Sequence, residues 1–151
     1  MKQILFLLPI LFLTFPSWAQ ERPLNTGLSN EEQYAFVGMT LENVIERFGP
    51  PRTVAAARGA DLWQDDVVFQ YTGVDFYFYI DRVWQVKFVK THDISNGDKK
   101  ADVILALGET VKDMEDHVLL AIDGFAWPLT LRINFNDKEI VTSIFLYRPD
   151  Y

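Results

Sequence analysis

Few side chains in this sequence could perform nucleophilic chemistry. Histidine occurs only as His92 and His117, cysteine is absent, and beyond residue 19 serine occurs only as Ser29, Ser95 and Ser143. A Ser-His-Asp triad would have to use these residues. However, no serine lies in the context of a hydrolase nucleophile, and neither histidine has a recognisable relay partner. The sequence therefore predicts a protein that is not an enzyme.

Carboxylates are more frequent, and some of them could pair as acid and base or bind a metal ion. The candidates are Asp61, Asp65, Asp66, Asp113, Glu115 and Asp116. They cluster at predicted turns, where aspartate satisfies backbone donors and keeps the surface soluble. His117 lies beside two of them without the i, i+4 spacing of a helical metal motif. Residues 93–98 resemble a calcium loop but lack the glutamate at its twelfth position. We therefore expect no metal ion and no other cofactor.

The start of the chain has the three parts of a secretory signal peptide. Lys2 precedes an apolar run over residues 4–15, and the small residues Ser17 and Ala19 occupy positions −3 and −1 before Gln20. The alternative is an uncleaved membrane anchor. A membrane-spanning helix needs about 20 apolar residues, and this run is too short for one. The pattern predicts cleavage after residue 19.

Removal of residues 1–19 would give a periplasmic or secreted protein with no stable membrane anchor. Without cysteine, the chain forms no disulfide and has no lipid-bearing cysteine of the bacterial lipoprotein type. The formal net charge is −7 and falls by one more unit when Lys2 is removed. Nucleic acids and anionic membrane surfaces bind basic patches, so this charge argues against both as partners.

The exported part is predicted to be one α+β domain that follows a short arm. Residues 20–33 are polar with little periodicity, which predicts a flexible N-terminal arm. Residues 34–151 are numerous enough for one domain whose core needs neither a metal nor a disulfide.

A short amphipathic helix is predicted at Leu41 to Phe48, because its apolar residues recur at i, i+3, i+4 and i+7. Thr40 is the natural N-cap, and Gly49 suits the left-handed position after the last turn. The period then changes to two, which predicts an antiparallel meander. Its candidate strands are Thr53 to Arg58, Asp66 to Tyr71, Val74 to Ile80 and Val83 to Lys90.

The same layout then recurs with an offset of 59 residues. Residues 97–108 match the first helix, with Gly97 or Asp98 as the expected cap, and three candidate strands follow: His117 to Ile122, Leu129 to Phe135 and Ile140 to Tyr147. We predict two tandem repeats, residues 36–90 and 97–148, although a chance recurrence of a common local pattern is the alternative. Each repeat alone would leave one sheet face bare, so the two should share a core. That core should include Val44, Ile45 and Phe48 with Val103, Ile104 and Leu107.

The first repeat resembles that of two known protein families. The residues that carry the resemblance are Gly38-Met39-Thr40, Val44, Phe48-Gly49-Pro50-Pro51, Trp63, Asp81-Arg82-Val83, Val86 and Phe88. They are similar to the repeat of the β-lactamase inhibitor proteins and of the SmpA/OmlA (BamE-type) outer-membrane assembly lipoproteins. The second repeat lacks the Gly-Met-Thr start and the prolines after its helix. The resemblance implies one curved antiparallel sheet with helices on one face and a concave open face that binds another protein.

Candidate binding residues follow from strand alternation. Along Val74 to Ile80, Val74, Phe76, Phe78 and Ile80 should face the core, whereas Tyr77 and Tyr79 should lie on the open face. The same alternation adds Arg132, Phe145 and Tyr147 from the second repeat. Aromatic side chains and arginine dominate binding energy at protein interfaces. The alternative is that these rings only stabilise an exposed sheet as cross-strand pairs.

These observations predict an exported, non-enzymatic protein-binding module whose partner the sequence does not identify. One alternative is an accessory scaffold for envelope or outer-membrane assembly. Another is a small hydrolase or ligand-binding protein with a cleft lined by Trp63, Trp84 and carboxylates.

Overall fold

The computed structural model describes residues 22–58, 66–108 and 110–150. The predicted signal peptide and Trp63 lie outside the described residues, as do Asp61 and Asp65. No helix within the described ranges is long and apolar enough to cross a membrane.

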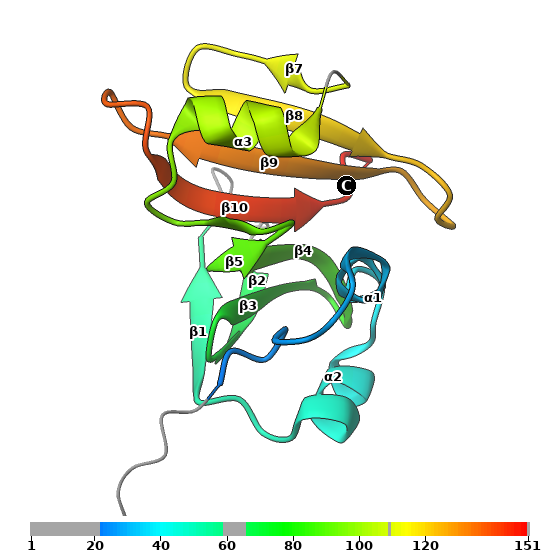
Figure 1. Ribbon diagram of the computed structural model, residues 1–151. Coiled ribbons are helices and arrows are strands. Elements are labelled where there is room, and N and C mark those ends of the chain that lie inside the picture. The colour runs from blue at the N-terminus through cyan, green and yellow to red at the C-terminus, as the bar shows by residue number, and fades with distance from the viewer. Residues whose placement is uncertain (1–21, 59–65, 109, 151) are drawn as a thin grey trace, which may run out of the picture.

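The main feature is an antiparallel sheet in which eight strands of the described chain take part (Figure 1). These strands are β1 (Thr53–Ala57), β2 (Asp66–Tyr71), β3 (Val74–Tyr79), β4 (Arg82–Phe88), β7 (Lys112–Asp113), β8 (His117–Ile122), β9 (Leu129–Phe135) and β10 (Val141–Tyr147). Their order is β1-β2-β3-β4-β10-β9-β8-β7. Two meanders therefore meet at the centre of the sheet, where their last strands, β4 and β10, pair antiparallel. A large antiparallel sheet with a few short helices confirms the predicted α+β class.

The core lies on one face of this sheet, beneath α2 (Leu41–Phe48) and α3 (Lys100–Leu107). Val44 of α2 and Val103 of α3 belong to the same cluster of buried residues as Phe76, Ile133 and Ile144 from the strands. The two meanders and both helices thus contribute to one contiguous core. This arrangement leaves the opposite face of the sheet, called the open face below, without a covering helix among the described elements.

Local sequence explains helix α2 well. The hydroxyl of Thr40 accepts a hydrogen bond from the Asn43 N–H (3.1 Å), and the Asn43 side chain accepts one from the Thr40 N–H in return. Gly49 ends the helix with φ of 78°, a conformation that glycine adopts without strain. One expected core residue is wrong: Ile45 is 39 % exposed, because the helix is only two turns long and Val44 faces the sheet.

The start of helix α3 differs from the expectation. Its N-cap residue is Lys99, and no side chain caps it. The predicted cap Asp98 instead accepts a hydrogen bond from the Ser95 N–H (2.7 Å). Lys100 is buried and points away from solvent, donating to the Met114 carbonyl (2.8 Å) and pairing with Asp113 (2.7 Å). Lys100 therefore links helix α3 to the segment that precedes β8.

The turn between β3 and β4 corrects a second expected core residue. Ile80 was predicted to continue the buried face of its strand, but β3 ends at Tyr79 and Ile80 is 81 % exposed. Its φ of 58° is unusual for a β-branched residue. A tight hairpin turn requires this left-handed conformation at the position that Ile80 occupies.

Residues 22–33, predicted as a flexible arm, pack against the domain. Asn25 and Gln33 are buried, and the Asn25 amide donates to the Gln33 side chain (3.0 Å) and to the Lys90 carbonyl (2.6 Å). Helix α1 (Asn30–Tyr34) begins at a Ser29 cap. The prediction of a flexible arm is wrong. Its polar side chains form hydrogen bonds with each other and with the backbone of a small hairpin. This hairpin pairs β5 (Lys90–Thr91) with β6 (Ile94–Ser95).

A long connection from the second meander also reaches the first. Trp127, between β8 and β9, lies against Gly38, which precedes α2. The neighbouring Phe125 makes an edge-on contact with Tyr34 of α1, with ring centroids 5.5 Å apart. Figure 1 shows this β8–β9 connection extending beyond the sheet on the side where α1 lies. The two halves are thus joined by loop packing as well as by the β4–β10 pairing.

Candidate protein-binding face

Two rows of side chains cross the open face, and the strand registers define them. The first row runs through Gln70, Asp75, Lys87, Phe145, Arg132 and Leu119. The second runs through Val68, Tyr77, Gln85, Tyr147, Thr130 and Ala121. Residues in one row are direct cross-strand neighbours, whose side chains are close enough to interact. The rows therefore run side by side over β2, β3, β4, β10, β9 and β8, and Val68 at the β2 end of the second row is buried.

The structure brings four of the five predicted binding residues together at the centre of these rows. Tyr77 and Phe145 contact each other edge to face, with centroids 6.5 Å apart. Arg132 is the cross-strand neighbour of Phe145, and Tyr147 follows Phe145 by two positions on β10. Tyr79 lies apart, at the end of β3 opposite Arg82. The five side chains are half-buried rather than fully exposed.

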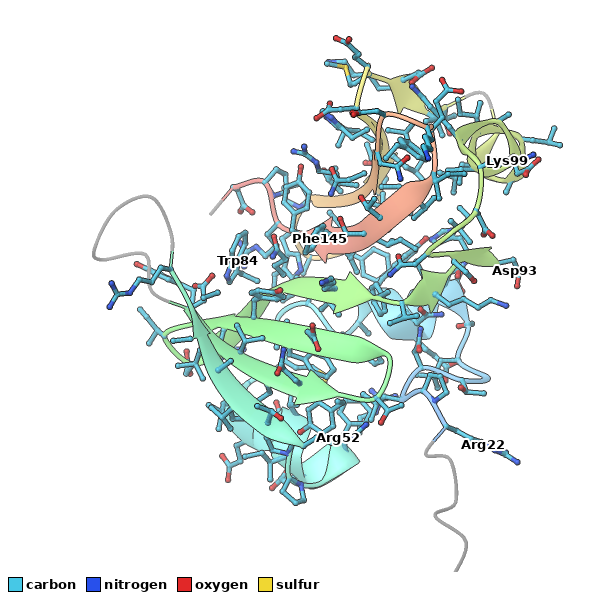
Figure 2. The ribbon with its side chains drawn as sticks, turned by 90° about the vertical axis from the view of Figure 1, so that its left-hand side faces the viewer. Arg22, Arg52, Trp84, Asp93, Lys99 and Phe145 are labelled. Atoms are coloured by element: carbon cyan, nitrogen blue, oxygen red, sulfur yellow. The ribbon has the colours of Figure 1, made fainter. Side chains whose placement is uncertain are left out.

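Trp84 joins this face because of a β-bulge. The β3–β4 register shifts between Tyr77 and Phe78, so the extra residue Trp84 lies beside Gln85, between the buried Val83 and Val86. Its indole N–H donates to the Asp66 carboxylate (3.1 Å). In Figure 2, Trp84 and Phe145 lie on the side of the sheet away from Lys99, which precedes α3. Strict alternation would have placed Trp84 on the core face, so the sequence pattern could not assign it.

Burial alters the acid–base properties of two groups in the rows. It raises the pKa of the Asp75 carboxyl, and the charge of Lys87 opposes this shift. Burial also raises the pKa of Tyr77, with further contributions from the negative charges of Asp75 and Asp66. Tyr77 therefore keeps its proton at neutral pH and offers a hydroxyl donor to a partner.

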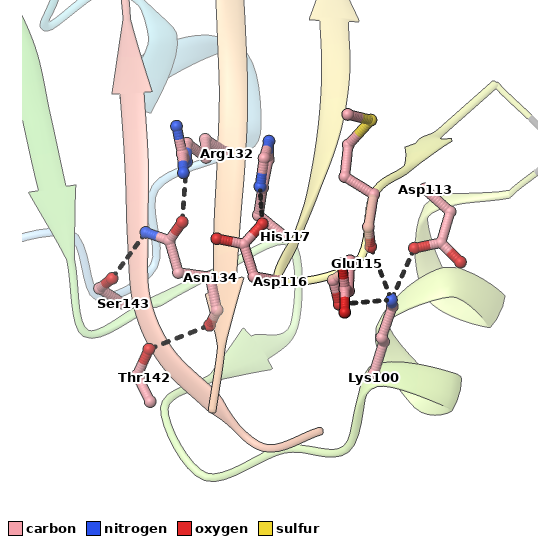
Figure 3. A network of polar contacts seen from close by, with 10 residues as sticks. Lys100, Asp113, Glu115, Asp116, His117, Arg132, Asn134, Thr142 and Ser143 are labelled. Atoms are coloured by element: carbon pink, nitrogen blue, oxygen red, sulfur yellow. Dashed lines mark hydrogen bonds and ion pairs between the residues drawn. The ribbon is translucent and has the colours of Figure 1, made fainter. Parts of the chain in front are cut away.

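Arg132 is held by a short hydrogen-bond chain (Figure 3). Its Nε donates to the Asn134 side-chain oxygen (2.7 Å), and the Asn134 amide donates to the Ser143 hydroxyl (2.9 Å). On the neighbouring strand, the ring Nδ1 of His117 and the Asp116 carboxylate are hydrogen-bonded (2.6 Å), and this bond lowers the pKa of Asp116. The hydrogen bonds from Arg132 through Asn134 to Ser143 fix the orientation of the Arg132 side chain on the sheet.

The residues singled out for possible catalysis occupy separate structural positions. Ser29 caps α1, Ser143 bonds Asn134, and Ser95 belongs to the small hairpin. His92 bonds Tyr34 and Asn30, whereas His117 bonds Asp116. In the described ranges, no three His, Asp or Glu side chains are grouped so that they could hold a metal ion.

A polar groove of about 880 Å³ lies away from these rows, between the N-terminal segment and the β5–β6 hairpin. Asn25, Gln33, Thr91 and His92 line it. The Tyr34 hydroxyl and the Asn30 amide hold the two ring nitrogens of His92. His92 therefore couples the N-terminal segment to the hairpin that joins the two meanders.

His92 should make stability depend on pH. Burial lowers its pKa below the ordinary 6.5, and the charges of Glu31 and Asp93 oppose this shift. The folded chain then binds the proton more weakly than the unfolded chain, so stability should decrease as pH falls below 6.5 through the folded-state pKa. Denaturant unfolding of the wild type and His92→Gln from about pH 7.5 to pH 5 measures this effect. The variant should lose less stability, and parallel curves would contradict the assignment.

Comparisons with known proteins identify no family. No family model matches the chain, and no curated protein matches it. One similar solved structure, at 1.5 Å resolution, is an extracellular protein containing a SCP domain from Bacillus anthracis str. Ames. It shares 11 % sequence identity with a TM-score of 0.49, over 90 % of this chain and 51 % of that one. The chain thus spans about half the length of that protein, and similarity at this level says nothing about function.

Proposed function

We propose that this chain is an exported, non-enzymatic module that binds another protein through the open face of its sheet. The observation behind this function is the central cluster of Tyr77, Phe145, Tyr147 and Arg132, which lie next to one another in the two rows. Tyrosine and arginine are enriched among the residues that carry most of the binding energy in protein interfaces. Their half-buried positions hold the rings in place, so little side-chain entropy is lost on binding.

We further infer that the domain consists of two repeats, residues 36–90 and 97–148. Equivalent backbone hydrogen bonds support this inference. The Gly38 N–H donates to the Val83 carbonyl (2.7 Å), and 59 residues later the Gly97 N–H donates to the Val141 carbonyl (2.9 Å). The Leu41 N–H donates to the Asp81 carbonyl, and 59 residues later the Lys100 N–H donates to the Glu139 carbonyl.

The bulges provide a second correspondence between the repeats. The extra residue of β4 is Trp84, and that of β10 is Thr142, which is 58 positions later and follows the same buried valine position. Bulges bend a strand and increase its twist, so two bulges at matching places would curve the sheet symmetrically about the β4–β10 junction. This curvature is what the resemblance to β-lactamase inhibitor proteins implies for a concave binding face.

Site-specific photocrosslinking in the exporting cell tests this function. A photoreactive residue at Tyr147 should crosslink a partner protein, whereas the same residue at Leu105, which is 84 % exposed on α3, should not. The identity of the captured protein then distinguishes two roles. A soluble enzyme would indicate an antagonist, and a membrane barrel component would indicate an assembly scaffold. Equal crosslinking from both positions, or none from Tyr147, would contradict binding through the open face.

A further inference from the structure

Charges on the open face are unevenly distributed. Its acidic positions, Asp66 and Asp75, are on β2 and β3 of the first meander. The basic positions Lys87 and Arg132 are on β4 and β9 and flank the central strand β10. This local positive charge contrasts with the formal net charge of −7 for the whole chain.

Lys87 and Arg132 lie on the two sides of one aromatic ring. The register of β10 pairs Phe145 with Lys87 on one side and with Arg132 on the other. Neither cation forms an ion pair with another residue of the described ranges, and the only hydrogen bond of the Arg132 side chain there uses Nε. Both residues are half-buried, so their aliphatic stems pack along the sheet. A carboxylate of a partner that approaches either cation is attracted to it, more strongly near the protein surface than in bulk water.

The acids nearest to these cations do not neutralise both of them. Asp66 accepts a hydrogen bond from Trp84, and Asp116 is hydrogen-bonded to His117. Asp75 is the cross-strand neighbour of Lys87 but lies on the side away from Phe145. The surface over β4, β10 and β9 is therefore apolar at its centre and has one cation on each side. Asp75 lies near Lys87 and Asp116 near Arg132, but neither acid forms an ion pair with its cation within the described ranges.

We propose that the partner protein covers this surface with an acidic segment whose carboxylates contact Lys87 and Arg132 while an apolar side chain packs on Phe145. This inference rests on the proposed function and specifies the chemistry of the partner. A nucleic acid or another extended polyanion fits less well, because the net charge of the chain would repel its remaining charges. A protein loop delivers one or two carboxylates together with apolar surface.

The test uses two matched peptides and the full-length exported chain. One peptide has a central phenylalanine flanked by glutamates, and the other has lysines in place of the glutamates. Nuclear magnetic resonance titration should shift the amide signals of residues 87, 132 and 145 with the glutamate peptide only. Lys87→Gln and Arg132→Gln should each reduce its apparent affinity at least threefold, and Lys99→Gln, an exposed lysine beside α3, should leave it unchanged.

The outcomes separate this inference from the proposed function. If the glutamate peptide does not bind while Tyr147 still crosslinks a partner, the acidic segment is wrong and the binding face remains. If both peptides bind equally, charge does not select the partner, and the inference also fails. If the glutamate peptide binds but Tyr147 crosslinks no protein, the surface binds anions without a protein partner, and both proposals fail.

Discussion

Gly38→Ala is expected to destabilise the domain by about 4 kcal/mol, a large part of the roughly 5–15 kcal/mol that stabilises a typical domain. An added Cβ would lie 2.0 Å from a ring carbon of Trp127, so the indole must move. The φ of 93° at Gly38 adds strain for any residue with a side chain. Displacing Trp127 also removes its stacking with Arg148, whose guanidinium lies 4.8 Å from the ring centre.

Gly97→Ala is the matched control. Gly97 holds the corresponding position before α3 with φ of 98°, but nothing lies within 4 Å of an added Cβ. Only backbone strain remains, so the expected cost is about 1 kcal/mol. Both variants should unfold in a single transition, measured by denaturant titration, because Trp127 joins the two halves over a common core. Equal losses would show that the Trp127 contact contributes little, and two separate transitions in either variant would contradict the common core.

The sequence predicted those elements whose local signals agree with their packing. Helix α2 has a capping threonine, apolar residues on the face toward the sheet and a glycine after its last turn, and its bounds match the prediction. Strands β2, β8 and β9 also match, because each alternates between the core and the open face and ends at a turn. In these segments, the short-range pattern and the tertiary contacts require the same conformation.

Elements that depend on distant residues could not be predicted in the same way. The N-terminal segment is polar, and its order comes from hydrogen bonds between Asn25 and residues far along the chain, such as Lys90. Strand β7 has only two residues, too short for a detectable period. Trp127 occupies a loop, and its contact with Gly38 follows from the spatial arrangement of the two meanders.

The sequence predicted only part of the candidate site, because it shows strand alternation but not bulges or the pairing of distant strands. Alternation was sufficient to select Tyr77, Phe145, Tyr147 and Arg132, which the structure brings together on one face. It also selected Tyr79, which lies at the edge of this cluster. Trp84 was considered only for the cleft of the alternative hydrolase or ligand-binding protein, and Lys87 was not selected. The bulge that moves Trp84 to this face, and the β4–β10 pairing that brings Lys87 next to Phe145, are visible only in three dimensions.

Binding through the open face predicts that Tyr77→Ala and Tyr147→Ala weaken partner binding by about 2 kcal/mol or more, roughly thirtyfold in Kd. Their folding stability should fall by about 1 kcal/mol at most, since a half-buried ring on a sheet contributes mainly through cross-strand contacts. Phe76→Ala should behave in the opposite way. Phe76 is fully buried, so its loss should cost about 3–5 kcal/mol of stability without changing Kd for the folded fraction.

The measurement that tests this account most directly is calorimetric binding combined with thermal melting on these three variants, using the partner captured by crosslinking. The account predicts weak binding with near-normal melting for both tyrosine variants, and normal Kd with early melting for Phe76→Ala. It is contradicted if both tyrosine variants bind as tightly as the wild type. It is equally contradicted if both lose several kcal/mol of stability, because the rings would then belong to the core rather than to a binding surface.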